Sequence, residues 1–323
     1  MGPNMLSGDI AKLERSILNE EQLYIPKSKS LKPLYRAIYQ RQQIYDQQIK
    51  SMKTAADQRD TFKSDIQQIR AQHHMAEEIQ RGMLPDMTEI AGNGRLFDVF
   101  ADMDTAWEIG GDFYDCFLLD DHRLFVLIAD VSGKSVSAAM FSMAAMTAIR
   151  ISLLDGKHLD ETACAVSRYL YGTQHERGHM FVTAWMGILD IANGQISYIN
   201  AGHEPPIYVG NSGSVHFCDE RSGIPFASYF SKRRPELNQY QERTMKMDKG
   251  DFLILYTDGL SECMNSSGIR FGKERILKSI EKYEITEKTV PEEIVRYLQR
   301  RAMEFADHAQ QDDDITILAM KRM

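Results

Sequence analysis

Carboxylate groups at the ends of apolar segments are the residues best suited to do chemistry in this sequence. Asp130 ends the run LFVLIAD, and Asp258 ends FLILYTD with a glycine directly after it. Asp112 follows two glycines, and the triplet 312–314 precedes the apolar segment ITIL. A single carboxylate of this kind is more often a turn residue or a helix cap. Burying a carboxylate is nevertheless costly unless the carboxylate is paired or binds a cation. The recurrence at four strand ends therefore predicts one carboxylate cluster.

Such a cluster predicts a divalent metal site. Unit charges about 4 Å apart repel by roughly 4 kcal/mol at an effective dielectric constant of 20, so the carboxylates must take up protons or cations. The donors are all oxygens, which favours Mg²⁺ or Mn²⁺. Two such ions can hold a bridging hydroxide and a phosphoryl group for in-line attack. Nuclease or polymerase chemistry is the alternative, and the acidic balance of the chain argues against it.

The segment 133–135, Gly-Lys-Ser, raises the possibility of a nucleotide-binding P-loop. That loop needs a further glycine five residues before Gly133, and Ile128 stands there. The loop is too short to enclose phosphates, so the P-loop is rejected. Lys134 is then expected to be solvated and Ser135 to cap a helix, whose Met140, Met143, Met146 and Ile149 are expected to form a core stripe.

Composition limits the class of protein. The chain has 323 residues, a formal net charge of −8 and 43% hydrophobic residues, which suits one or two domains and argues against nucleic-acid binding. Its four cysteines contain no CxxC pair, as in a reduced cytosolic protein. The N-terminus lacks a basic start followed by an apolar run, and no window approaches the length of a membrane span. We therefore expect a cytoplasmic protein.

Residues 1–84 are expected to form a helical region that serves as a dimerisation and signalling linker. Helices are predicted over 8–25 and onward from Pro33, with 24–33 as a linker. Two heptad series of the long helix carry apolar residues, namely Ile38, Tyr45, Met52 and Ile66 in one and Ala55, Phe62, Ile69 and Ala76 in the other. Arg59, His73, Arg41 and Gln48 interrupt them. The narrow stripe favours a coiled coil and a homodimer, the alternative being a long helix packed on its own domain.

Residues 85–323 have the pattern of a second domain. Strands are predicted at 97–103, 112–119, 124–131, 181–191, 196–202, 252–259 and 315–322. Helices are predicted at 135–153, 159–175, 272–282 and 290–307. Because short turns join most consecutive strands, the sheets should be largely antiparallel. Strands and helices that cluster separately predict an α+β sandwich.

Eight motifs in this domain resemble one known family. They are EIQRGMLP, IGGDFYD, ADVSGKSVSAAM, MFVTAWMGILD, YINAGHEPP, LYTDGLSE, FGKERI and QDDDITIL, in this order. Together they resemble the metal-dependent PPM (PP2C-like) protein phosphatases, in the bacterial branch typified by RsbU and SpoIIE. The likeness runs from about Glu78 to the C-terminus. It implies two antiparallel β-sheets flanked by helices, with two Mn²⁺ or Mg²⁺ ions at one edge.

The resemblance also implies roles for individual residues. Asp130 should bridge both metals, and Val131 should offer its carbonyl to one of them. Asp258 and Asp313 should bind the other metal, with Asp312 and Asp314 as alternatives to Asp313. Asp112 should support the second metal directly or through water.

Two positions need separate expectations. The family usually has glycine where Ser135 stands, so local geometry at the metal loop is in question, although no ligand is removed. His203 is a candidate proton donor, but a loop histidine more often orders the backbone, and that is the favoured interpretation.

The resemblance implies hydrolysis of phosphoserine or phosphothreonine on a protein. The usual substrate in this branch is a phosphorylated STAS-domain anti-sigma-factor antagonist in a partner-switching pathway. An upstream sensor or response regulator is left open as a further partner. The alternative function is a regulatory module that binds the phosphoprotein or its kinase without turnover.

Overall fold

The computed structural model describes residues 3–18, 24–27, 29–87, 96–174, 180–218, 220–228 and 239–323. Contacts between Cα atoms divide the chain into two compact units, Met1–Ala71 and Gln72–Met323. The last turns of the long helix α2 (Lys32–Met83) thus belong to the second unit. The division at 84/85 expected from the sequence remains a proposal.

The first unit contains α1 (Pro3–Leu18) and most of α2. The helix predicted over 8–25 is too long, because Tyr24 and Ile25 are not helical; residues 19–23 lie outside the described part of the chain. Tyr24 instead returns to α1, where its Oη donates to Asp9 Oδ1 at 2.9 Å and its backbone N–H donates to Ser16 Oγ at 3.1 Å.

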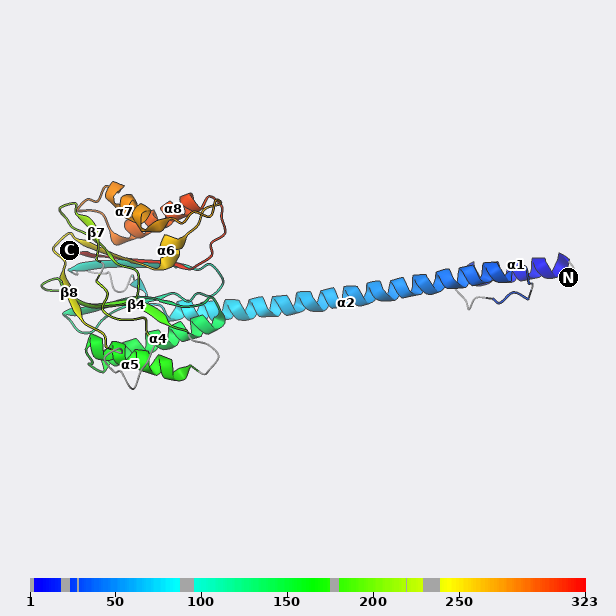
Figure 1. Ribbon diagram of the computed structural model, residues 1–323, viewed down its shortest axis with the longest axis horizontal. Coiled ribbons are helices and arrows are strands. Elements are labelled where there is room, and N and C mark those ends of the chain that lie inside the picture. The colour runs from blue at the N-terminus through cyan, green and yellow to red at the C-terminus, as the bar shows by residue number, and fades with distance from the viewer. Residues whose placement is uncertain are drawn as a thin grey trace. The chain divides into compact units, whose positions relative to one another are not determined.

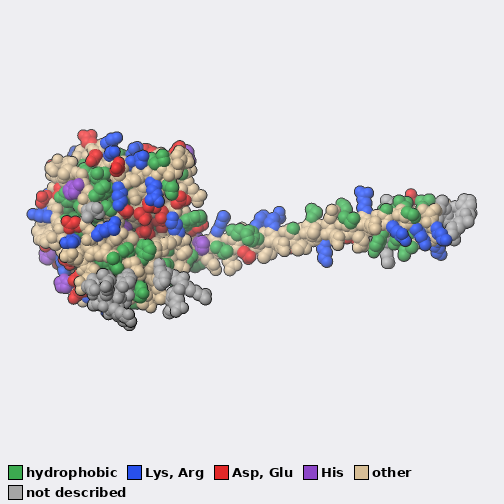
Figure 2. Space-filling view, in the orientation of Figure 1, with side chains coloured by type: hydrophobic (Ala, Val, Ile, Leu, Met, Phe, Trp, Pro, Cys, Tyr) green, Lys and Arg blue, Asp and Glu red, His purple; other side chains and the backbone are tan. Residues whose placement is uncertain are grey.

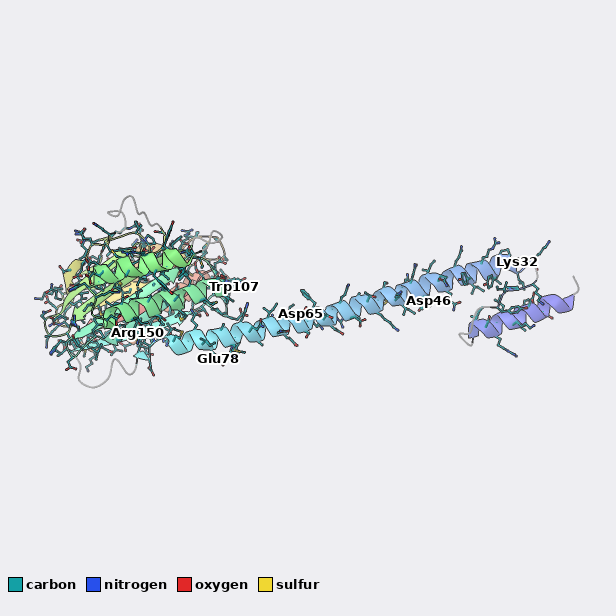
Figure 3. The ribbon with its side chains drawn as sticks, turned by 90° about the horizontal axis from the view of Figure 1, so that it is seen from below. Lys32, Asp46, Asp65, Glu78, Trp107 and Arg150 are labelled. Carbon is teal, nitrogen blue, oxygen red and sulfur yellow. The ribbon has the colours of Figure 1, made fainter. Side chains whose placement is uncertain are left out.

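Helix α2 is 52 residues long because nothing in its sequence ends it earlier. Pro33 stands in its first turn, where a missing N–H costs no hydrogen bond, and the next glycine is Gly82. Figure 3 shows Asp46 and Asp65 projecting from this helix. Apolar side chains of its stripe are also exposed, among them Tyr45 at 64%, Met52 at 72% and Phe62 at 67%.

The second unit is a sandwich of two β-sheets (Figure 1). Each sheet has five strands among the described residues. One sheet has the order β1-β10-β9-β6-β7, the other β2-β3-β4-β5-β8, and every pair of neighbours is antiparallel. The strands are β1 (Phe97–Asp104), β2 (Phe113–Leu118), β3 (Arg123–Val131), β4 (Val182–Asp190), β5 (Gln195–Ala201), β6 (Ile207–Val209), β7 (Val215–Phe217), β8 (Arg243–Lys246), β9 (Phe252–Tyr256) and β10 (Ile315–Arg322). The predicted antiparallel α+β sandwich is confirmed.

Two pairs of helices cover the outer faces of the sandwich. The helices are α4 (Val136–Leu154), α5 (Leu159–Thr173), α6 (Asp258–Glu262), α7 (Gly272–Lys282) and α8 (Pro291–Ala306). Helices α4 and α5 lie side by side over the β2–β8 sheet, and α7 and α8 cover the other sheet (Figures 1 and 3). One hydrophobic core lies under each pair of helices, and another, which includes Trp185, Leu255 and Met320, fills the space between the sheets.

Helix α4 is held to β2 by a partly buried ion pair between Arg150 and Asp115. Asp115 is fully buried, and Arg150 donates to both of its carboxylate oxygens, one of them at 2.9 Å from Nε. The guanidinium carbon also lies 4.4 Å from the ring centre of Phe117. Because one face of α4 stays outside, the expected stripe is only partly right: Met146 and Ile149 are buried, whereas Met140 is 71% exposed.

Helix α4 also corrects one expectation about membranes. In length and composition it is a candidate membrane span, the one such helix among the described residues, whereas no window of the sequence was expected to qualify. Half of the apolar segment of α4 is buried inside the domain, and its Ala145 and Ile149 belong to the core between the helix and the sheet. Core helices of soluble proteins have the same composition, so a membrane span is not indicated.

Candidate metal centre

The antiparallel register brings the predicted carboxylates to one end of the sandwich. Phe113, the first residue of β2, pairs with Ala129, so Asp112 and Asp130 lie at the same end of one sheet. In the other sheet, the end of β9 pairs with the start of β10, which brings Asp258 near the 312–314 triplet. Figure 2 shows acidic side chains gathered on this face of the domain, with lysines and arginines beside them.

Asp112 connects the two sheets. Its side chain is buried, and its Oδ2 accepts hydrogen bonds from Thr257 Oγ1 at 2.7 Å and from Thr316 Oγ1 at 2.6 Å. Burial, together with repulsion from Asp130 and Asp314, raises the pKa of Asp112 well above its usual value, and the two hydroxyls oppose that rise.

Asp130 and Asp258 are both buried and repelled by neighbouring carboxylates. Burial, with repulsion from Asp258 and Asp313, raises the pKa of Asp130 to about 7. Burial, with repulsion from Asp313 and Glu262, raises the pKa of Asp258 to about 6. Negative charge so close together is stabilised by protons or by bound cations.

The adjacent side chains of Asp313 and Asp314 make different contacts. Asp314 accepts from the backbone N–H groups of Ala106 at 2.9 Å and Gly111 at 2.8 Å, so it fixes the turn before β2. Asp313 is 35% exposed, and its Oδ2 lies 3.1 Å from Lys134 Nζ. Lys134 is 44% exposed, as expected of a solvated residue, but it also pairs with Asp313 and donates to the Asp312 carbonyl, which the sequence did not predict.

Two glycines leave room for the backbone at this centre. A Cβ on Gly111 would lie 2.8 Å from the Val131 carbonyl oxygen and 3.6 Å from Asp130 Oδ1, so glycine keeps open the space between these two oxygen donors. A Cβ on Gly259 would overlap the Asp314 backbone. The glycines after aspartate in TDG and before it in GGD are thus required by close backbone approach.

The donor set fits a hard divalent cation. Asp112, Asp130, Asp258, Asp313 and the Val131 carbonyl are all oxygen donors. Burial, and after it repulsion from neighbouring carboxylates, raises the pKa of Asp130 and of Asp258, and a bound cation would offset both effects. Among the described residues, no group of three or more His, Cys, Asp or Glu side chains already forms a metal-binding cluster. The ligand assignment is therefore a proposal based on charge and donor chemistry.

His203 orders its loop, and its imidazole is uncharged at neutral pH. Its side chain is buried, its Nδ1 lies 2.9 Å from Thr183 Oγ1, and its backbone N–H donates to Asn200 Oδ1 at 2.8 Å. Burial lowers the pKa of His203 to about 3. A neutral buried imidazole is a poor proton donor, which supports the structural interpretation favoured from the sequence.

Ser135 is the N-cap of α4, as the sequence predicts. Its backbone is extended, and its Oγ accepts from the Ala138 backbone N–H at 3.4 Å. We expect Ser135→Gly to cost only a few tenths of a kcal/mol, because glycine is nearly as good a cap. Activity of the variant should equal or exceed that of the parent in an assay with p-nitrophenyl phosphate. A hundredfold loss would place the hydroxyl in the chemistry.

A residue that sequence reasoning missed lies at the end of α2. Gln80 is only 3% exposed, its Nε2 donates to the Gly110 carbonyl at 2.8 Å, and its Oε1 accepts from the Gly110 N–H at 3.3 Å. Its position in the EIQRGMLP motif was the available signal. A search for apolar residues at heptad spacing does not select Gln80, because glutamine is polar.

Residues 120–323 match the family model of stage II sporulation protein E (SpoIIE). The chain belongs to the SpoIIE family. This confirms the family expected from the eight motifs.

Individual relatives agree with this assignment. Protein IcfG of Synechocystis is 30% identical over 270 residues, which are 76% of this chain and 40% of IcfG. Phosphoserine phosphatase RsbU of Bacillus subtilis is 24% identical over 273 residues, which are 83% of this chain and 75% of RsbU. The SiaA-PP2C domain of Pseudomonas aeruginosa superposes with a TM-score of 0.65 at 20% identity, covering 79% of this chain and 97% of that one. The PP2C-like fold is therefore confirmed.

Proposed function

We propose that this chain is a metal-dependent phosphatase that removes phosphate from phosphoserine or phosphothreonine of a regulatory protein. The observation that carries the proposal is the convergence of Asp112, Asp130, Asp258 and Asp313 at one end of a PP2C-like sandwich. Its similarity to RsbU, a phosphoserine phosphatase, supports the same reaction. We further propose a cytoplasmic location and, as substrate, a phosphorylated STAS-domain anti-sigma-factor antagonist.

The chain's own residues would provide the ligands of the metal site. Asp112, Asp130, Asp258, Asp313 and the Val131 carbonyl would hold two Mn²⁺ or Mg²⁺ ions. When bound, these ions supply an activated water and charge stabilisation for the phosphoryl group.

Groups around these ligands would keep them in place. Thr257 and Thr316 fix one oxygen of Asp112, and the Asp314 carboxylate fixes the turn through Gly111. Lys134 brings a positive charge to the exposed edge beside Asp313, where a phosphate would enter. We propose no covalent phosphoenzyme and assign Ser132 and Ser135 structural roles, since their Oγ atoms accept from the backbone N–H groups of Phe181 and Ala138.

The direct test is turnover on two substrates. Purified protein should hydrolyse p-nitrophenyl phosphate and a phosphoserine-containing STAS protein with Mn²⁺, and should lose both activities in EDTA. Binding of the phosphoprotein without phosphate release would support the alternative, a regulatory module without turnover. Hydrolysis that EDTA leaves unchanged would contradict a metal-dependent mechanism.

A cavity beside the carboxylates offers a contact for a protein substrate. It measures about 350 Å³, and both Lys134 and Asp313 line it together with the apolar side chains of Met264, Met303 and Ile315. Because the cavity adjoins the reaction centre, we propose that it receives an apolar side chain next to the phosphorylated residue.

Replacing Met303 separates protein recognition from chemistry. Met303→Gln makes one wall of the cavity polar with little change in size. It should lower kcat/KM for the phosphoprotein by roughly three- to tenfold, as expected for lost burial of a half-exposed apolar group. Turnover of p-nitrophenyl phosphate should not change, and Met303→Leu should keep both activities. Equal losses on both substrates would show that Met303 supports the site itself.

The exposed stripe of α2 supports a homodimer. Phe62 is 67% exposed and Ile66 36% exposed in the single chain, and a narrow stripe of this kind is readily buried against a second copy. Polar residues at the seam, such as Arg59 and His73, would weaken the pairing and allow its state to be adjusted by an upstream partner.

Light scattering on Phe62→Glu tests the dimer. We expect the parent chain to be dimeric at tens of micromolar, and the variant to be monomeric with lower activity toward the phosphoprotein. A chain shortened to begin at Met75 should also be monomeric. Gln68→Glu, off the seam of the same helix, is the matched control and should stay dimeric. A monomeric parent chain would reduce α2 to a spacer.

A further inference from the structure

Gln80 makes an unusually complete contact with one backbone unit. Its carboxamide donates to the Gly110 carbonyl and accepts from the Gly110 N–H, at 2.8 and 3.3 Å. The side chain is 3% exposed, so both of its polar ends are withdrawn from water and depend on Gly110. A buried amide is tolerated only when it is paired in this way.

The backbone unit that Gln80 holds leads directly into the proposed metal centre. Gly111, the next residue, donates its N–H to Asp314 Oδ2 at 2.8 Å, and Asp112 follows. A Cβ at Gly110 would collide with the Asp314 carboxylate, so the turn has no freedom on that side. A short series of contacts thus joins Gln80 to Asp112 and Asp314 through two consecutive peptide units.

The position of Gln80 along α2 connects this contact with the heptad pattern of the helix. Gln80 lies seven residues after His73, in the heptad series that also contains Ile66. The stripe proposed to pair two chains therefore continues into the residue that holds the turn. A small rotation or shift of the last turn of α2 would move the carboxamide relative to Gly110.

We infer that Gln80 is a positioning residue, through which the last turn of α2 sets the Gly110–Gly111 turn and thereby the placement of Asp112. This inference rests on the proposed function, since it names the control point of that same site. It assigns no contact between Gln80 and substrate. Loss of the carboxamide would leave the fold intact but release the turn, which weakens metal binding and slows the chemical step together.

The test compares three full-length variants. Gln80→Leu keeps the size of the side chain and removes both hydrogen bonds. Gln80→Glu keeps an acceptor for the Gly110 N–H but places a carboxylate against the Gly110 carbonyl. Gln72→Leu makes the same chemical change at an exposed position of the same helix and is the matched control.

Mn²⁺ affinity from calorimetry is the primary measurement, followed by kcat and KM for p-nitrophenyl phosphate and by the melting temperature. For Gln80→Leu we expect roughly tenfold weaker Mn²⁺ binding and about tenfold lower kcat, with KM nearly unchanged. Gln80→Glu should show a loss of the same kind, and Gln72→Leu none. If Gln80→Leu fails to fold, Gln80→Glu carries the test alone.

Two outcomes would overturn the inference. One is a folded Gln80→Leu with parental Mn²⁺ affinity and kcat. The other is a loss in kcat that only follows a lower melting temperature and disappears on cooling, which would make Gln80 a simple packing residue. If the parent protein binds Mn²⁺ but hydrolyses no phosphoester, the proposed function fails, and Mn²⁺ affinity still decides the role of Gln80.

Discussion

Asp258→Asn should lower kcat by at least about a thousandfold while the protein stays folded. The side chain lies at the start of α6, directly after β9, where burial and repulsion from Asp313 and Glu262 raise its pKa to about 6. Asparagine keeps the shape and removes the charge that would hold a divalent cation. Since catalysis by a two-metal centre depends on that charge, nearly all turnover should be lost.

The same substitution should not destabilise the metal-free protein. Removal of one carboxylate from a repelling group relieves repulsion, so the melting temperature in EDTA should stay equal or rise. Mn²⁺ should raise the melting temperature of the parent protein and have a smaller effect on Asp258→Asn, because a ligand stabilises only the state that binds it. Asp130→Asn should behave in the same way.

The control is Asp248→Asn. The Asp248 side chain is 78% exposed, and the residue lies between β8 and β9, at the opposite end of β9 from Asp258. It should keep parental kcat and the full response to Mn²⁺. Parental activity in both Asp130→Asn and Asp258→Asn would refute the site assignment. Loss of folding in both would instead show that the carboxylates are structural.

Gly111→Ala should lower kcat/KM by about a hundredfold or more. The new methyl group would lie 2.8 Å from the Val131 carbonyl oxygen and 3.2 Å from the Gly133 carbonyl oxygen. Both are backbone atoms of the segment that follows Asp130, so the contact cannot be relieved by rotating a side chain. The segment must shift, and shifts of this size at reacting groups are costly.

Gly172→Ala is the matched control for that substitution. Gly172 lies within α5, and a Cβ there meets nothing within 4 Å. Alanine should be neutral or stabilise the helix by roughly 0.5–1 kcal/mol. Urea unfolding of both variants, together with kcat/KM, separates a loss of stability from a displaced site. Parental kcat/KM in Gly111→Ala would show that the Val131 carbonyl has no part in the centre.

Local patterns were sufficient to predict the main strands, the α+β class and the carboxylate-rich end of the sandwich. Alternating or continuous apolar runs identify strands such as β3 and β10 because burial selects those residue types. Ser135 was predicted as a cap from its position alone, since capping depends only on the next few residues. Strands β6 to β8 were missed because three or four residues carry too little pattern.

Contacts between distant segments were decided by the tertiary structure alone. The sequence offers Asp312, Asp313 and Asp314 with equal chemistry, and only the folded chain aims Asp314 at the backbone of Ala106 and Gly111 while Asp313 faces Lys134. Met140 was placed in the core by its spacing, yet α4 covers only one side of a sheet and leaves it outside.

Gln80 shows the same division most clearly. Its type and its place in a motif can be read from the sequence, but a glutamine on a helix is usually solvated. Only the approach of Gly110, 30 residues away, makes it a buried partner of the metal-binding turn. The sequence by itself thus determined which residues are able to do chemistry. The fold decided which of them come into contact, because contacts between distant segments depend on tertiary packing, which the local sequence of neither segment specifies.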